Sequence, residues 1–177
     1  FLSSYPNAKD VRLTYARVLI DQKQYENARR EFQVILDGKP DELSSTYALG
    51  MLSIQTNDFI AAEKYLTNYV TALSKKPDED RDPTQAYIVL GQIAEERKDI
   101  DTAIKWLSQV EAGDAYLGAQ IKRAQLLAKR GDLSDARALL MNLKPEGERD
   151  RAKVIIAEAQ LLRDANLQIE ALSVLQK

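Results

Sequence analysis

Residues 84–110 read TQAYIVLGQIAEERKDIDTAIKWLSQV, and the pattern in this stretch decides the fold. Apolar and small residues recur there at helical spacing in two runs, which predicts two amphipathic helices broken at Lys98 and Asp99. Gly91 and Ala103 lack bulk where the two helix backbones would approach each other. A glycine inside a helix costs about 1 kcal/mol relative to alanine. We therefore expect Gly91 to be compensated by close packing of the two helices.

The same pattern occurs five times along the chain, with two small residues always twelve positions apart. The first small position holds Ala16, Gly50, Gly91, Ala124 and Ala159. The second holds Ala28, Ala62, Ala103, Ala136 and Ala171. A large apolar residue follows each second position by four residues, as Phe32, Leu66, Leu107, Leu140 and Leu175. Successive copies begin 34, 41, 33 and 35 residues apart, so the chain is predicted to be a repeat array.

This unit resembles the tetratricopeptide repeat (TPR), a helix-turn-helix of about 34 residues. Leu49-Gly50 and Leu90-Gly91 match the Leu-Gly pair of that family, and Pro40 stands where its closing proline does. The resemblance implies an all-α fold, a right-handed superhelix or solenoid of about five repeats. The family's bulky aromatic near the start of the first helix is kept only as Tyr87, which predicts looser helix contacts elsewhere. The other copies hold Arg12, Thr46, Gln120 and Ile155.

The repeat pattern predicts one TPR array over residues 1–177, in which each unit stacks only on its neighbours. All five prolines fall between the expected repeats, as helix breakers should. Asp10 is the expected N-cap of the first helix. Because the chain starts at Phe1 and the last repeat is short, we expect both ends to continue in a longer protein. The expected segments are 1–8 as the end of a preceding repeat, 9–42, 43–83 with an extended loop, 84–116, 117–151, and 152–177 as a truncated repeat.

Composition excludes several classes of function. The net charge is −2 and no basic cluster appears, so we expect no nucleic-acid partner. The sequence has no histidine and no cysteine, which removes the commonest nucleophiles and metal ligands. No phosphate-binding glycine loop is present either. No apolar run is long enough to span a membrane. We therefore predict that the chain is not an enzyme, has no cofactor or metal site, and does not insert into a membrane.

Three features could suggest chemistry, and each has a plainer interpretation. Residues 75–83, KKPDEDRDP, carry four carboxylates, but the glycine and regular spacing of a calcium loop are absent. A solvated linker is the favoured interpretation. Glu95 and Glu96 are adjacent in a helix and point about 100° apart, so they do not converge on one substrate. Trp106 precedes the core position Leu107, which favours packing over ligand stacking.

The resemblance also implies a binding surface, because the fifth and ninth positions of the first TPR helices line a concave groove. These two positions are four residues apart and share a helix face. The fifth position holds Leu13, Tyr47, Ile88, Ile121 and Ile156. The ninth holds Arg17, Met51, Gln92, Gln125 and Gln160. The expected surface is an apolar stripe edged by polar side chains, although partial burial of the apolar residues against neighbouring helices is the alternative.

These features predict a non-catalytic scaffold or adaptor that binds a partner protein or peptide in the concave groove. Two alternatives stay open: a regulatory arm of an enzyme whose catalytic domain lies outside this sequence, and self-association through open repeat ends. The sequence of residues 123–162 is similar in style to exported TPR lipoproteins of Gram-negative bacteria, some of which are adaptors for envelope enzymes. That similarity suggests a periplasmic or outer-membrane-associated location, and a cytoplasmic scaffold is the competing expectation.

Overall fold

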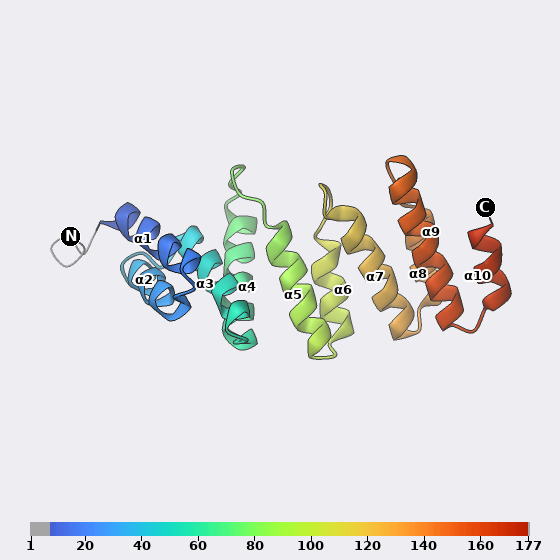
Figure 1. Cartoon of the computed structure of the whole chain (residues 1–177), viewed down its shortest axis with the longest axis horizontal. Helices are drawn as coiled ribbons and strands as arrows, with labels where there is room; N and C mark the ends of the chain where they lie inside the picture. Colours follow the sequence, from blue (N-terminus) through green and yellow to red (C-terminus); the bar gives the residue numbers. More distant parts are fainter. Residues whose placement is uncertain (1–7, 177) are drawn as a thin grey trace. The chain divides into compact units, whose positions relative to one another are not determined.

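The computed structural model describes residues 8–176, and this part of the chain consists of α-helices and their connections. It divides into two compact units, Phe1–Ala86 and Tyr87–Lys177, which are described separately below. The predicted end of a preceding repeat at residues 1–8 falls, except for Ala8, outside the described residues. Figure 1 shows the helices coloured along the sequence.

The first unit is built from two helix pairs. Neighbouring helices in the sequence pack on each other throughout the unit (Figure 1). Ala8 occupies the N-cap position of the first helix, so Asp10 lies in its first turn and the predicted cap is wrong. Phe32, Leu49 and Leu66 are almost fully buried at the centre. The helices are α1 (Lys9–Asp21), α2 (Tyr25–Gly38), α3 (Leu43–Gln55) and α4 (Phe59–Lys75).

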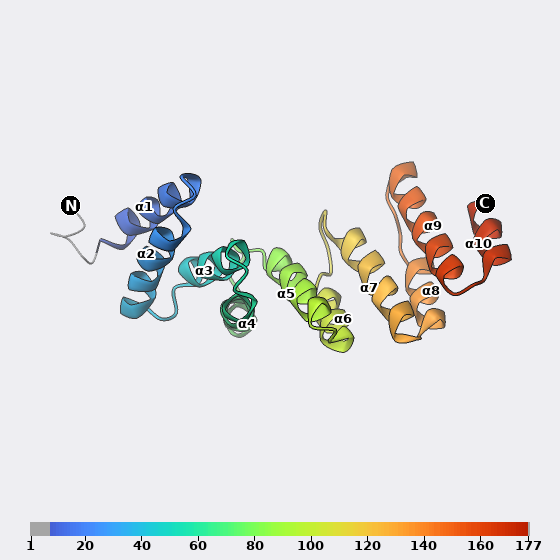
Figure 2. The same cartoon turned by 60° about the horizontal axis from the view of Figure 1, so that its bottom comes forward.

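The second unit continues the pattern of helix pairs. α7 packs on α6, α8 and α9, and α10 packs back on α9 across a tight turn, as Figure 2 shows. The first three residues of α5 precede the division between the units. The helices are α5 (Thr84–Glu96), α6 (Ile100–Ser108), α7 (Tyr116–Arg130), α8 (Leu133–Met141), α9 (Gly147–Asp164) and α10 (Gln168–Leu175). Pro40, Pro77, Pro83 and Pro145 all lie outside the helices.

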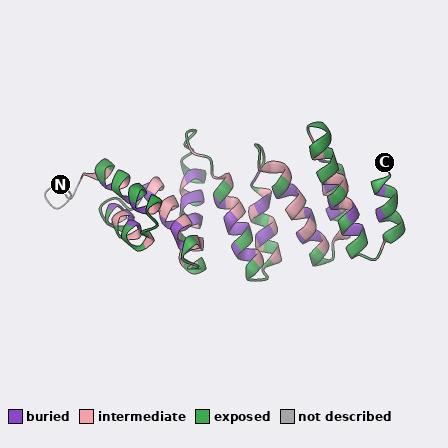
Figure 3. Cartoon of the chain, in the orientation of Figure 1, coloured by how far each residue is buried: buried purple, intermediate pink, exposed green. Residues whose placement is uncertain are grey.

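All ten small residues of the repeated pattern are buried. Figure 3 colours the buried positions of the helices purple. Gly50 shows why the position must be small, because a Cβ built there would lie 2.6 Å from Cδ2 of Leu66. A Cβ at Gly91 would lie 3.1 Å from Cγ of Leu107. The close approach predicted from the sequence is therefore confirmed in both helix pairs, and it is tighter at Gly50.

The helices of each pair are joined by the same turn. One residue has a left-handed backbone, and the next residue donates its N–H to a carbonyl near the end of the first helix, over 2.8 to 2.9 Å. This bonding satisfies the free carbonyls at the helix end. Only one turn uses glycine, which adopts this conformation without strain. The left-handed residues are Lys23, Asn57, Lys98, Gly131 and Asn166.

Polar residues replace the aromatic near the start of three first helices. Arg12 is buried and forms an ion pair with Glu31 of α2. The hydroxyl of Thr46 donates to the carbonyl of Glu42 over 2.9 Å. Gln120 is buried and donates from Nε2 to the carbonyl of Val110 over 3.0 Å. At Arg12 and Gln120 the prediction of looser contacts is wrong, because each buried side chain has a partner outside its own helix. The hydroxyl of Thr46 bonds to the N-cap residue of its own helix, so the prediction stays untested there.

The terminal helices of the described chain expose apolar side chains. On α10, Ile169, Leu172 and Leu175 are 82%, 61% and 54% exposed and are spaced three residues apart, so they share one face. Leu175 is thus exposed, whereas its counterparts in the other four copies are buried. Among the described helices, only α9 packs extensively on α10, so no other described helix covers this face. None of the helices in residues 8–176 has both the length and the apolar character needed to cross a membrane.

Candidate functional site

Four of the ten predicted groove residues come together in one pocket of the first unit. Leu13 and Arg17 lie one turn apart on α1, and Tyr47 and Met51 lie one turn apart on α3. The pocket has a volume of about 610 Å³, which is in the range of small-molecule and side-chain binding sites. We call it the N-terminal pocket. Its lining residues are Leu13, Arg17, Ile20, Tyr25, Phe32, Ser44, Tyr47, Ala48, Met51, Leu52, Gln55 and Arg81.

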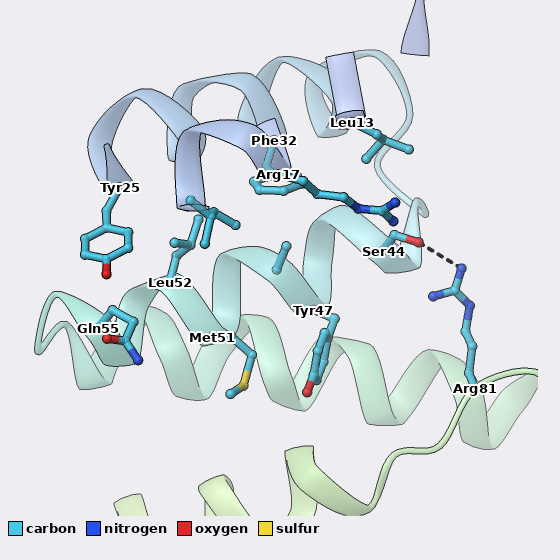
Figure 4. A pocket seen from close by; sticks show the side chains of 12 residues that line it. Leu13, Arg17, Tyr25, Phe32, Ser44, Tyr47, Met51, Leu52, Gln55 and Arg81 are labelled. Carbon is cyan, nitrogen blue, oxygen red and sulfur yellow. Dashed lines mark hydrogen bonds between the residues drawn. The ribbon is translucent and has the colours of Figure 1, made fainter. Parts of the chain in front are cut away.

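Apolar side chains dominate the N-terminal pocket (Figure 4). Phe32 and Leu52 are buried, whereas Tyr47 and Met51 are half-buried and present part of their surface to the cavity. The ring of Tyr47 packs on Tyr69 of α4, with 5.0 Å between centroids and an angle of 47°. This contact orients Tyr47 at the side of the pocket. The site can therefore desolvate an apolar group of a ligand.

Burial of the Tyr47 side chain raises its pKa above the ordinary value of 10.0, and the nearby Asp82 carboxylate adds to the effect. The hydroxyl therefore stays protonated at physiological pH. A neutral phenol can donate a hydrogen bond to a ligand and also accept one. Tyr47 thus offers both an apolar ring and a polar group at the pocket.

Arg81 belongs to the loop between α4 and α5, yet it reaches back to α3. Its Nη2 donates to the hydroxyl of Ser44 over 2.9 Å, and its Nε donates to Oδ2 of Asp78 over 3.0 Å. The acidic loop therefore contributes a cation to the pocket, which its interpretation as a solvated linker did not include. Among residues 8–176, no group of three or more His, Cys, Asp or Glu side chains is arranged so that it could hold a metal ion.

A second pocket of about 510 Å³ lies within the second unit, and α5 and α7 provide most of its lining. Two predicted groove residues, Ile88 and Gln92, line it. Lys122 of α7 and Glu95 of α5 also line it and form an ion pair of 2.8 Å. Glu95 therefore serves as the partner of Lys122, and its charge is already neutralised within the chain. Gly91, Leu107, Ala115, Gly118 and Ala119 complete the lining.

A third pocket of about 590 Å³ involves α7 and α9. The predicted residues Gln125 and Gln160 line it. Lys129, Arg163 and Asp164 also line it, so this pocket is more polar than the N-terminal pocket. Arg163 pairs with Asp164 over 3.0 Å. The amides of the two glutamines are the groups best suited to hydrogen-bond a polar ligand there.

The remaining two predicted residues, Ile121 and Ile156, line none of these three pockets. Ile121 is half-buried against the core between α7, α8 and α9, as the alternative interpretation of the stripe expected. Ile156 is 49% exposed on α9. Trp106 stacks on Tyr87 at 6.1 Å and 23°, which fits the packing role predicted for it.

Sequence reasoning missed the part of the N-terminal pocket that lies outside the first helices of the repeats. Tyr25 and Phe32 come from α2, and Arg81 comes from the loop before α5. The 41-residue spacing and the charged stretch between Pro77 and Pro83 are the sequence signals that mark this loop. That spacing does not reveal that Arg81 bonds to Ser44, because the bond depends on how the loop folds back.

Comparisons with known proteins agree with this architecture. No family model matches the chain. The TPR repeat-containing protein PA4667 of Pseudomonas aeruginosa is 29% identical over 92 residues. This match covers 52% of the chain and 16% of that longer protein. The chain is therefore similar to a bacterial TPR protein along about half of its length.

Solved structures of similar fold cover nearly the whole chain. A crystal structure of MamA has a TM-score of 0.73 and 14% identity, over 95% of this chain and 88% of that one. The structure of YrrB, described as a TPR protein with an unusual peptide-binding site, also has a TM-score of 0.73. Its sequence identity is 16%, and the match covers 98% of this chain and 87% of that one. The TPR-like repeats of a Podospora anserina putative kinesin light chain have a TM-score of 0.66 and 18% identity. This match covers 94% of this chain and 91% of that one. The chain thus has the all-α solenoid fold of TPR proteins.

Proposed function

We propose that the chain is a non-catalytic protein-interaction module that binds a segment of a partner protein in the N-terminal pocket. The observation that carries this proposal is the meeting of Leu13, Arg17, Tyr47 and Met51 in one pocket. These four residues occupy groove positions that the TPR resemblance implies, and they come from two different helices. Their shared pocket supports the proposal that a partner binds there.

The chemistry of the pocket supports binding of a peptide segment rather than catalysis on a substrate. Its surface is apolar around Phe32, Leu52 and Met51, with polar groups at Ser44, Gln55 and Arg81. Apolar side chains of a bound segment would gain from desolvation, and the polar groups would orient its backbone. The peptide-binding site described for YrrB shows that a similar fold has this use in that protein. The same use is proposed here.

The proposal is tested by affinity capture from a lysate of the source organism, using wild type and Met51→Glu. Met51 lies on α3 and is half-buried at the pocket. A charge there opposes desolvation of an apolar ligand. Quantitative mass spectrometry should find proteins that the wild type recovers and the variant loses. Circular dichroism must show the same helicity for both proteins.

Ile60→Glu is the matched control. Ile60 lies on α4, is 76% exposed and does not line the N-terminal pocket. The control should recover the same partner as the wild type. Equal recovery by wild type and Met51→Glu would contradict binding in this pocket. Loss of the partner with Ile60→Glu but not with Met51→Glu would show that the partner binds on α4 instead.

A second candidate function is self-association, and the exposed stripe on α10 favours it. Three large apolar residues occupy one face there, while Ala171 and Val174 of the same helix are buried. α1 also exposes Val11, Tyr15 and Val18 at 44%, 44% and 45%, spaced four and three residues apart. Exposed apolar stripes of this kind mark interaction surfaces.

Light scattering tests self-association. It should show association of the wild type that Leu172→Ser weakens, and a monomer at all concentrations would exclude this function.

A location in the bacterial envelope is the finer form of the adaptor proposal. This proposal rests on the similarity of residues 123–162 to exported TPR lipoproteins. The Pseudomonas relative supports a bacterial origin. Fractionation of cells that make the intact protein tests it. Recovery with the periplasm or outer membrane supports an envelope adaptor, and recovery with the cytoplasm supports the competing scaffold.

A further inference from the structure

The N-terminal pocket carries positive charge that is not balanced by its own lining. Arg17 and Arg81 are the charged members of the twelve residues that line it, and none of the twelve is acidic. This imbalance is local, because the whole chain has a net charge of −2. An apolar cavity with two cationic groups attracts a ligand that combines an apolar group with an anion.

The guanidinium of Arg81 is held at the pocket by the loop that carries it. Its Nη2 bonds to Ser44 and its Nε to Asp78, and the backbone N–H of Arg81 donates to the carbonyl of Asp78 over 3.0 Å. Two hydrogen bonds leave further N–H donors of the guanidinium available, since arginine has five. An arginine fixed in this way loses less conformational entropy when it binds an anion.

Arg17 approaches the same end of the pocket from α1. Figure 4 shows its side chain extended toward the end of the pocket where Arg81 bonds to Ser44. Arg17 is exposed, and none of the ion pairs among residues 8–176 involves it. Its charge therefore remains available for a ligand.

The carboxylates nearest in sequence to Arg81 already have partners. Asp78 pairs with Arg81 itself. Asp82 accepts a hydrogen bond from the backbone N–H of Thr84 over 2.9 Å. Hydrogen bonding from the side chain and then the backbone of Thr84 lowers the pKa of Asp82, so the carboxylate stays ionised. Neither aspartate lines the pocket. Arg17 therefore supplies the unpaired positive charge for a carboxylate brought by a ligand, and Arg81, although paired with Asp78, can add hydrogen bonds from its remaining N–H donors.

We propose that the N-terminal pocket binds an acidic peptide segment of a partner protein. A large apolar side chain of the segment enters the cavity beside Tyr47 and Met51, and an adjacent Asp or Glu side chain binds Arg17 and Arg81. This inference rests on the function proposed above and specifies its ligand. Guanidinium groups suit the task because their planar donors match the two oxygens of a carboxylate.

The test is a selection from a library of random dodecapeptides displayed on phage, with the purified chain as bait. Each peptide is fused at its C-terminus, so only side-chain carboxylates can supply the anion. Dissociation constants of the selected peptides are then measured for wild type, Met51→Glu, Arg17→Gln, Arg81→Gln and Arg30→Gln. Arg30 is an exposed arginine of α2 that does not line the pocket, and it provides the matched control.

Selected peptides should place Asp or Glu within two residues of a large apolar side chain. Arg17→Gln and Arg81→Gln should each weaken binding about fivefold, as expected for a partly exposed ion pair, while Arg30→Gln has no effect. Binding that needs Met51 but neither arginine, by peptides without acidic residues, would overturn this inference and leave the proposed function standing. If no selected peptide is affected by Met51→Glu, both proposals are overturned.

Discussion

Leu66 fills the space in which a side chain at Gly50 would lie. A Cβ on Gly50 would be 2.6 Å from Cδ2 of Leu66 and 2.7 Å from its Cγ, and Leu66 is fully buried. α3 and α4 can approach this closely because Gly50 has no side chain. The close packing of α3 on α4 in the first unit thus depends on a glycine at position 50.

Gly50→Ala should therefore destabilise the first unit. Overpacking of a buried site costs about 1 to 3 kcal/mol, whereas the gain in helix propensity is about 1 kcal/mol. We expect a net loss of about 1 kcal/mol in the free energy of unfolding, measured by urea denaturation. Gly91→Ala should be close to neutral, because its Cβ would meet Leu107 at 3.1 Å and needs only a small shift.

Gly38→Ala is the control for this comparison. Gly38 ends α2, and nothing lies within 4 Å of the position of its Cβ. Only the gain in helix propensity then applies, so Gly38→Ala should stabilise slightly. If Gly50→Ala were as stable as Gly38→Ala, the close approach of α3 and α4 would be contradicted.

Glu42 should make folding stability depend on pH. Its carboxylate caps α3 by accepting from the backbone N–H of Ser45 over 2.6 Å, and Lys9 lies 3.4 Å away. Burial alone would raise the pKa of Glu42, but the bonds from Ser45 and the charge of Lys9 outweigh it and lower the pKa below 4.5. Ionised Glu42 therefore stabilises the fold above pH 4.5, and this contribution is lost as the pH falls through the lowered pKa.

The Glu42→Gln variant tests this dependence. At pH 7 it should be less stable than wild type by about 1 kcal/mol, the usual cost of a lost helix cap. The difference should be smaller at pH 3, because protonation of Glu42 increases as the pH falls below 4.5 and toward its lowered pKa. Glu26→Gln, at an exposed position of α2, should match wild type at both pH values. A pH-independent difference for Glu42→Gln would show that the charge has no part in the cap.

Gln120 should stabilise the second unit through its bond to the carbonyl of Val110. Gln120→Leu keeps the volume similar but leaves that carbonyl without its side-chain donor. We expect a loss of about 1 to 2 kcal/mol in the free energy of unfolding. Gln109→Leu, at an exposed position, is the control and should change stability little. An unchanged stability for Gln120→Leu would mean that the carbonyl finds another donor, such as water.

Much of the fold could be predicted from the sequence, because repetition reveals which positions matter. Ala28 and Gly50 look ordinary alone, but five copies show that a small residue is required there. The helix breaks were predictable for the same reason. The burial of Arg12 was not, since its ion pair with Glu31 of the next helix depends on tertiary packing.

The candidate site was predictable only where it follows repeat register. Tyr47 and Met51 were found because the resemblance assigns their helix face to the groove. Ile121 occupies the same register but packs into a core, so register alone does not establish exposure. Arg81 could not be found, because its role depends on how an irregular loop folds back onto Ser44.

The central claim is that a partner segment occupies the N-terminal pocket. The most direct measurement places the photo-crosslinking residue benzoylphenylalanine at Gln55, an exposed residue that lines the pocket, in cells that make the protein. A second variant carries it at Ile60, outside the pocket. We predict a defined crosslinked partner from Gln55 that is absent from Ile60 and lost when Met51→Glu is added. Crosslinks from Ile60 with none from Gln55 would contradict binding in this pocket.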